Sequence, residues 1–194
     1  RLEHFQDEGS VVIQLLFSGP GQPEIIIPPE ALAVQAGLLG EYFDNVDLTN
    51  LADTRVDPNV DFTNWGSAPS GTAVQPDDVW SERWTGYVRA TADGLWRFGT
   101  LSNDGVRLWV DDQLIIDNWT QHPTTTDVGA LSLSEGWYPI RLEHYQLGGD
   151  VAIQLSFSPP GQGMQVIPPT NLALVPGGGV LPPIVDAGGQ VQVL

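Results

Sequence analysis

The chain has 194 residues, with 24 acidic and 7 basic side chains and a formal net charge of −17. This charge excludes nucleic acid as an expected partner, because a nucleic-acid binder needs a basic surface to neutralise phosphates. It would also repel an anionic membrane surface. Bound divalent cations, which take oxygen ligands, are compatible with the acidity. The same acidity can equally serve only to keep a secreted protein soluble.

The composition favours short strands and turns over long helices. Glycine occurs 22 times and proline 16 times, while charged residues make up only 16 % of the chain. The chain has no cysteine, which excludes disulfides, thiolate metal sites and a cysteine nucleophile. No apolar run reaches the roughly 18 residues of a membrane span, so we expect no membrane insertion. A cysteine-free, acidic, all-β chain is typical of an extracellular, cell-surface repeat of bacteria.

An internal repeat divides the chain. Residues 1–34 align without a gap to residues 141–174, at an offset of 140, and about 20 of the 34 positions are identical. We therefore expect residues 1–36 to be the C-terminal strands of a preceding copy and residues 37–175 to be one complete copy. Residues 176–194 are predicted to be a linker and the start of a following immunoglobulin-like repeat. Neighbouring repeats in the same chain are then expected partners.

Strand patterns fill the predicted complete copy, and the segments between them contain turn residues. Residues 44–83 show little periodicity and are predicted to be long loops. Even spacing of strands and hairpins predicts an all-β fold, an antiparallel β-sandwich of barrel-like form with long loops. The predicted strands, in chain order, are 38–43, 84–90, 95–100, 106–110, 114–117, 128–133, 138–145 and 151–158.

Two turn-rich segments carry the side-chain oxygens that a cation could use. Asn103 and Asp104 precede Gly105 between two strands, where the same letters also form an ordinary turn. Gln146 and Asp150 flank a glycine-rich loop between two further strands, which is equally compatible with a plain hairpin. Calcium takes six to eight oxygen ligands, often including backbone carbonyls. The two loops could meet around one ion at one end of the sandwich.

Other polar and aromatic positions are less specific. Trp119, Gln121 and His122 open a loop, in which Trp119 could stack on a sugar or plug the end of the sandwich. The spacing of Asp53, Asp57 and Asp61 matches no calcium motif. Four tryptophans on strands are expected in the core, namely Trp84, Trp96, Trp109 and Trp137. Motifs of serine hydrolases, zinc peptidases and phosphate loops are absent, so we expect no enzyme.

Several segments together resemble one known family, the PA-fourteen domains first named for anthrax protective antigen and also found in flocculin adhesins. The match covers residues 37–175, with a second partial copy at the start of the chain. The segments that carry it are GLLGEYF (37–43), ERWTGY (82–87), GLWRF (94–98), SNDGVRLWVD (102–111), IDNW (116–119) and GWYPIRLE (136–143).

The resemblance implies a β-sandwich and, in its lectin members, a bound calcium. There, two neighbouring aspartates joined by a cis peptide hold the ion, and sugar hydroxyls complete its coordination. Asn103 and Asp104 match these aspartates, so one negative charge is missing and weaker affinity is expected. The loop 146–150 matches the one that supplies further ligands, here the Gln146 side chain and the carbonyls of Leu147 and Gly149.

The expected function is that of a calcium-dependent lectin module in a large extracellular bacterial adhesin, which would act in cell adhesion and biofilm formation. It would bind the vicinal diols of neutral hexose or fucose-like sugars in surface or polysaccharide glycans. Trp119, Gln121, His122 and Asp150 are expected to line the sugar site. Two alternatives stay open, a structural or protein-interaction spacer without sugar binding, and an accessory domain of a secreted polysaccharide hydrolase.

Overall fold

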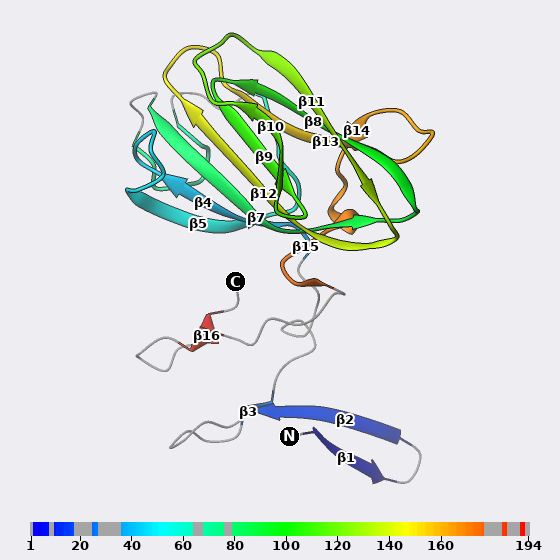
Figure 1. The fold of residues 1–194 in the computed structure, drawn as a ribbon. Helices are drawn as coiled ribbons and strands as arrows, with labels where there is room; N and C mark the ends of the chain where they lie inside the picture. Colours follow the sequence, from blue (N-terminus) through cyan, green and yellow to red (C-terminus); the bar gives the residue numbers. More distant parts are fainter. Residues whose placement is uncertain are drawn as a thin grey trace. The chain divides into compact units, whose positions relative to one another are not determined.

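A computed structural model describes residues 36–63, 68–75 and 79–176, together with the backbone of five further strands. The chain divides into two compact units. One unit comprises Arg1–Val34 with Val180–Leu194, and the other comprises Gln35–Gly179. Figure 1 shows both units, coloured along the sequence. No helix in the described part of the chain is long and apolar enough to cross a membrane.

The larger unit is an antiparallel sandwich of two sheets (Figure 1). The first sheet has seven strands in the order β10-β9-β12-β7-β4-β5, with β15 also paired to β7. Its strands are β4 (Leu38–Phe43), β5 (Leu51–Asp57), β7 (Trp80–Ala90), β9 (Val106–Val110), β10 (Gln113–Asn118), β12 (Gly136–Gln146) and β15 (Leu172–Ala173).

The second sheet has five strands in the order β11-β8-β13-β14, with β6 paired to β13. The all-β antiparallel sandwich is therefore confirmed, although the described strands form two separate sheets and no closed barrel. The strands of this sheet are β6 (Asp61–Phe62), β8 (Gly94–Asn103), β11 (Thr125–Leu133), β13 (Ala152–Ser158) and β14 (Gln165–Val166).

The smaller unit repeats part of this pairing. Its β2 (Ser10–Phe17) pairs with β3 (Ile25–Ile26) through Leu16↔Ile26 and Phe17↔Ile25. Adding the repeat offset of 140 gives Ser156↔Val166 and Phe157↔Gln165, which is the register of β13 and β14. The strand β1 (Leu2–Asp7) pairs directly with β2, whereas its counterpart β12 pairs with β7 and β9. The unit also contains β16 (Ile184–Val185) and β17 (Val191–Gln192), which pair with each other.

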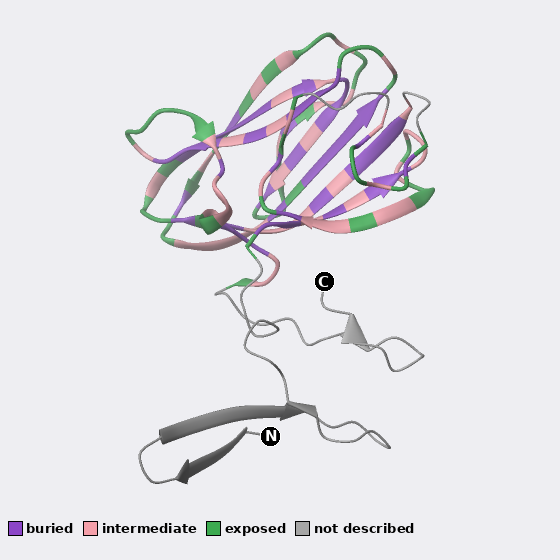
Figure 2. Ribbon diagram, turned by 180° about the vertical axis from the view of Figure 1, so that it is seen from behind, coloured by how far each residue is buried: buried purple, intermediate pink, exposed green. Residues whose placement is uncertain are grey.

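The core lies between the two sheets and follows the two-residue alternation of the strands. Trp80, Trp84, Trp96, Phe98 and Leu155 are fully buried, and Figure 2 shows the alternating buried positions along the strands. Trp96 stacks on Phe157 with ring centroids 5.5 Å apart. Burial of aromatic side chains on this scale is a large source of folding free energy.

Three expectations from the sequence were wrong in detail. Residues 44–83 hold β5, β6 and the first part of β7 rather than loops alone. The pattern was hidden because β5 is an edge strand with only Asp57 buried, so it needs no apolar alternation. Trp109 and Trp137 are partly exposed rather than in the core. Trp109 faces outward because it alternates with buried Leu108 and Val110.

A buried carboxylate anchors the end of β5. Asp57 accepts hydrogen bonds from Trp84 Nε1 at 2.8 Å and from Arg55 Nε at 2.7 Å, and a short one from the Tyr42 hydroxyl. Tyr42 and Trp84 are fully buried and meet edge to face, with centroids 6.0 Å apart. Three donors from three strands thus depend on one acceptor.

Replacing this acceptor should destabilise the domain. We expect Asp57→Ala to lower the free energy of unfolding by about 3–5 kcal/mol, because it leaves buried donors and the Arg55 charge without a partner. Urea denaturation at neutral pH measures the change. The exposed Asp117→Ala is a suitable control and should stay within about 0.5 kcal/mol of the parent chain. Equal effects of the two substitutions would contradict this role of Asp57.

Candidate functional site

Asp104 lies at the centre of the candidate site, in the turn between β8 and β9. Its side chain is almost fully buried, with 3 % of the residue exposed. Its Oδ1 accepts a hydrogen bond from the backbone N–H of His122 at 3.2 Å, and its Oδ2 accepts one from that of Leu147 at 2.9 Å. The peptide bond from Asn103 to Asp104 is cis, as the family resemblance implies. One carboxylate therefore ties together the β8–β9, β10–β11 and β12–β13 loops.

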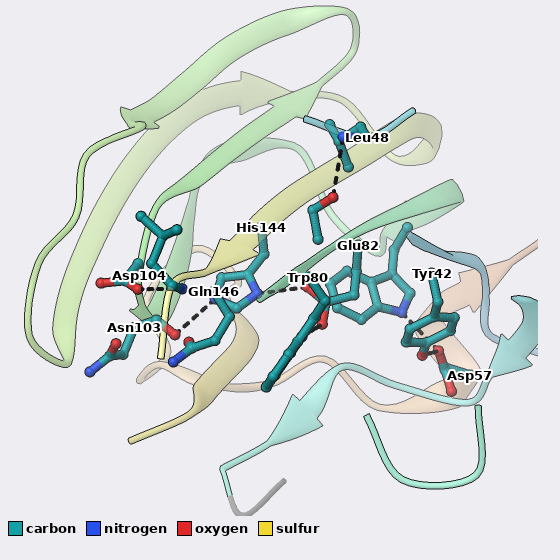
Figure 3. A network of polar contacts seen from close by, with 12 residues as sticks. Tyr42, Leu48, Asp57, Trp80, Glu82, Asn103, Asp104, His144 and Gln146 are labelled. Atoms are coloured by element: carbon teal, nitrogen blue, oxygen red, sulfur yellow. Dashed lines mark hydrogen bonds and ion pairs between the residues drawn. The ribbon is translucent and has the colours of Figure 1, made fainter. Parts of the chain in front are cut away.

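Gln146, the last residue of β12, forms a polar centre together with Asn103 and Asp104. The residue is fully buried, and its Nε2 donates to the Asp150 carbonyl at 3.4 Å. Because this contact fixes which end of the amide is nitrogen, the buried Oε1 is left without a hydrogen-bond donor. Figure 3 shows Gln146 next to Asn103 and Asp104. A buried acceptor without a donor is rare in proteins and indicates a missing partner.

The loop after Gln146 is shaped by glycines. Gly148 and Gly149 have φ angles of +102° and +89°, a region that L side chains rarely adopt. A Cβ on Gly149 would meet nothing within 4 Å, so the loop borders open space there. Leu147 and Asp150 are exposed. Asp150 meets the polar centre through its backbone carbonyl.

Trp119 reaches the site through Tyr145. Its ring meets Tyr145 edge to face, with centroids 4.8 Å apart. The Arg107 guanidinium lies 3.9 Å from the Trp119 centroid and covers one ring face. At least that face is occupied by a protein group, so a sugar could stack only on the other. Gly105 is needed beneath this pair, because a Cβ there would clash with the Tyr145 ring.

Gln121 and His122 lie on the β10–β11 loop, which contacts Asp104 through the His122 N–H. His122 is half-buried, and its Nδ1 lies 2.9 Å from the Pro123 carbonyl. Since a carbonyl only accepts, Nδ1 carries a hydrogen, and the buried Nε2 has no hydrogen-bond partner. Gln121 is exposed. Its place beside His122 is compatible with the expected contact to a ligand.

Tyr145 was not expected at the site. It is buried, and its backbone carbonyl accepts from the Asp104 N–H. Burial, together with the negative charge of Asp104, raises the pKa of its hydroxyl. Two more unexpected residues, Glu82 and His144, lie beneath the site and contact it through the backbone of Asn103. The alternation along β12 could have placed His144 and Gln146 on one inner face, but no sequence signal indicated Glu82.

The residues present fit a hard divalent cation. The described residues contain no cluster of three His, Cys, Asp or Glu side chains that could hold a metal. A cation would therefore need amide and backbone oxygens besides the Asp104 carboxylate, which is the mixed ligand set that calcium accepts. The unpaired Oε1 of Gln146 is one such oxygen. Asp57 belongs to the structural cluster at β5 instead of a second calcium site.

Comparison with known proteins identifies the family. The family model described as PA14 domain matches residues 35–171, so the chain belongs to the PA14 domain family, the PA-fourteen family of the resemblance above. The anti-sigma-I factor RsgI3 of Acetivibrio thermocellus is 36 % identical over 148 residues, which are 76 % of this chain. The chain spans only 22 % of that relative's length.

Solved structures show the same fold. An anti-sigma factor domain-containing protein from Clostridium clariflavum is 35 % identical with a TM-score of 0.64, covering 70 % of this chain and 46 % of the other. A PA14 sugar-binding domain from an RTX adhesin has a TM-score of 0.61 at 16 % identity, covering 73 % of this chain and 99 % of that domain. The second likeness concerns the fold alone. The relatives at higher identity are named as anti-sigma factors, so the expected adhesin context is not shown.

The raised pKa of Tyr145 predicts a change in stability at alkaline pH. Since this pKa lies above its value of about 10 in the unfolded chain, the stabilisation is complete below about pH 10 and is lost as the pH rises through the folded value. Tyr145→Phe should therefore reduce the loss of unfolding free energy above pH 10, measured by urea denaturation from pH 8 to 11. An alkaline decline identical to that of the parent chain would contradict the assignment.

Proposed function

We propose that the chain is a calcium-dependent carbohydrate-binding module that works outside the cell. The observation that carries this proposal is the unpaired Oε1 of fully buried Gln146, which directly precedes Leu147, the residue whose N–H binds the Asp104 carboxylate. An uncompensated polar atom costs about 1–3 kcal/mol when it is buried. A site that keeps such an atom one residue from a carboxylate contact is best explained by a ligand with positive charge.

Asp104, Asn103 and Gln146 would hold the ion with side-chain oxygens, and the carbonyls of Leu147 and Gly149 would add backbone oxygens. Bound calcium would supply open coordination positions that two neighbouring sugar hydroxyls can fill. Asn103 offers a neutral oxygen where the related lectins have an aspartate, so the site has one negative charge less. We expect weaker calcium binding than in a site with two aspartates, because calcium affinity depends on the charge of the ligands.

The loops around Asp104 would position the sugar. Two loops each donate a backbone N–H to the Asp104 carboxylate. The β10–β11 loop carries Gln121 and His122, and the β12–β13 loop carries Asp150. Trp119 contacts Tyr145 at the same end. The Nε2 of His122 is unpaired, and a sugar hydroxyl could satisfy it. A neutral hexose or fucose-like sugar fits the strong negative charge of the chain better than an anionic one.

The setting of the module is a separate part of the proposal. A solved structure with this fold is named a sugar-binding domain from an adhesin, which supports a place in an extracellular adhesin. The internal repeat of the chain supports a place beside further repeats. The relatives with higher identity are named anti-sigma factors, and this favours a second setting, a ligand-binding module on a regulatory protein. In both settings the module binds and does not catalyse.

Glycan binding with and without calcium tests the proposal. We expect residues 1–194 to bind diol-bearing neutral glycans on an array in about 1 mM calcium, the scale of extracellular calcium modules. Excess chelator should abolish the binding, and Asp104→Asn should weaken it strongly. Absence of binding in both conditions would favour the spacer function. Binding that survives chelation would contradict the calcium mechanism.

A second test separates the ligand role of Gln146 from a structural one. Gln146→Met removes the unpaired oxygen and keeps the volume, so without calcium the unfolding free energy should stay within about 1 kcal/mol of the parent or rise. Calcium affinity, measured by titration calorimetry, should nevertheless fall by about tenfold or more, because one ligand is lost. Gln154→Met is a control outside the site. Unchanged calcium affinity in Gln146→Met would exclude Gln146 as a ligand.

A further inference from the structure

A buried series of hydrogen bonds runs from the core to the backbone of the candidate site. Trp80 Nε1 donates to Glu82 Oε1, and Glu82 Oε2 lies 2.7 Å from His144 Nδ1. His144 Nε2 lies 3.0 Å from the carbonyl oxygen of Asn103. Trp80, Glu82 and His144 are all fully buried. Figure 3 shows the imidazole of His144 between Glu82 and the site.

The contacts determine where protons must lie. A carbonyl oxygen only accepts, so His144 Nε2 carries a hydrogen and donates it to Asn103. The contact between Nδ1 and Glu82 then requires a further proton between them, as an imidazolium facing a carboxylate or an imidazole facing a carboxylic acid. In both cases the pair is neutral as a whole and its ring is fixed in orientation. The hydrogen bond to Asn103 is therefore directed from a rigid, buried support.

Such a pair contributes little to stability by itself. Transfer of ionisable groups into the protein interior has a large desolvation penalty, and apolar side chains of similar volume often stabilise a fold equally well. The larger unit, Gln35–Gly179, already has a large aromatic core. A buried carboxylate and imidazole between β7 and β12 therefore suggest a positional role.

The internal repeat supplies an independent observation. His144 and Gln146 correspond to His4 and Gln6 at the offset of 140, and both residue types recur. The neighbouring loop positions differ, because Leu147 and Gly148 correspond to Asp7 and Glu8. The histidine and glutamine, which are buried in β12, thus recur together with the Arg, Leu and Glu of the same strand, while these two loop positions differ.

We propose that Glu82 and His144 are positioning residues of the candidate site. His144 holds the Asn103 carbonyl from inside the sandwich, and Glu82 holds the imidazole. Asn103 and Asp104 are thereby kept in the arrangement in which the Asp104 carboxylate accepts from the His122 and Leu147 N–H groups. The part of this proposal that concerns calcium rests on the proposed function, whereas the part that concerns loop geometry does not.

Hydrogen exchange of the calcium-free chain tests the geometric part. In His144→Met, which removes both ring nitrogens at similar volume, protection of the Leu147 and His122 amides should fall by about tenfold or more. His144→Gln keeps a donor toward Asn103 and should stay within about threefold of the parent chain. Asp57→Asn is the matched control, because it perturbs a buried carboxylate cluster away from the site. It should leave these two amides within about twofold.

Equal protection in His144→Met and Asp57→Asn, whether lowered or unchanged, would overturn the proposal. If His144→Met does not fold, Glu82→Met gives the same test, because it keeps a similar volume but removes the carboxyl group that holds His144 Nδ1. Lower protection of the two amides in Glu82→Met than in Asp57→Asn is then expected, and equal protection would overturn the proposal.

Calorimetric titration with calcium alone tests the functional part. Calcium affinity should fall by about tenfold in His144→Met, because His144 positions a segment that carries calcium ligands. It should stay unchanged in the control Asp57→Asn. If the parent chain binds calcium and His144→Met binds it equally well, the positioning role is wrong. If the parent chain binds no calcium at millimolar concentration, the proposed function fails, and the exchange measurement still decides the role of His144.

Discussion

The arrangement of the candidate site depends on the buried carboxylate of Asp104. The two carboxylate oxygens accept hydrogen bonds from the backbone N–H groups of His122 and Leu147, which lie on two different loops. The backbone N–H of Asp104 itself donates to the Tyr145 carbonyl at 3.2 Å. A nearly inaccessible anion is unfavourable unless charge-assisted hydrogen bonds compensate for the lost water. The loops that hold His122 and Leu147 therefore meet the β8–β9 turn at one point, because each of them supplies part of that compensation. The remaining acceptor capacity of the carboxylate is what a cation could use.

The interior of the sandwich is unusually polar at this end. In most of the unit, alternate strand residues are apolar and pack between the sheets, with Trp96 and Phe98 on β8 as examples. Farther along the same strand, the inward-facing positions are Thr100 and Ser102, whose buried hydroxyls lack hydrogen-bond partners. On β12 the inner face ends in His144 and Gln146. Loss of the apolar pattern at one end of both sheets is expected where stability has been exchanged for a binding site.

The sequence allowed the strands with clear alternation to be predicted, and β4 and β9 have the predicted bounds. It did not reveal β5, because an exposed edge strand carries no apolar alternation. From the residues alone, a meeting of the Asn103-Asp104 and Gln146–Asp150 loops was one possibility beside plain turns, and the family resemblance favoured it. The register that brings the loops after β8 and β12 together is a property of the whole sandwich. Glu82 could not be predicted, because it falls in residues 44–83, which were predicted to be loops and which hold the start of β7. Even within a strand, a charged residue normally indicates the outer face. The partner of Glu82, His144, lies 62 positions later in the chain.

Anomalous diffraction from a crystal of the chain grown in millimolar calcium would locate a bound ion at the site. We expect one strong peak within about 2.3–2.6 Å of the Asp104 carboxylate and of Gln146 Oε1, the usual distance of calcium to oxygen. Such a peak would also explain why Gln146 keeps a buried acceptor without a donor. A peak elsewhere, or none at this end of the sandwich, would exclude Asp104 and Gln146 as calcium ligands and leave the polar end of the interior as a structural feature only.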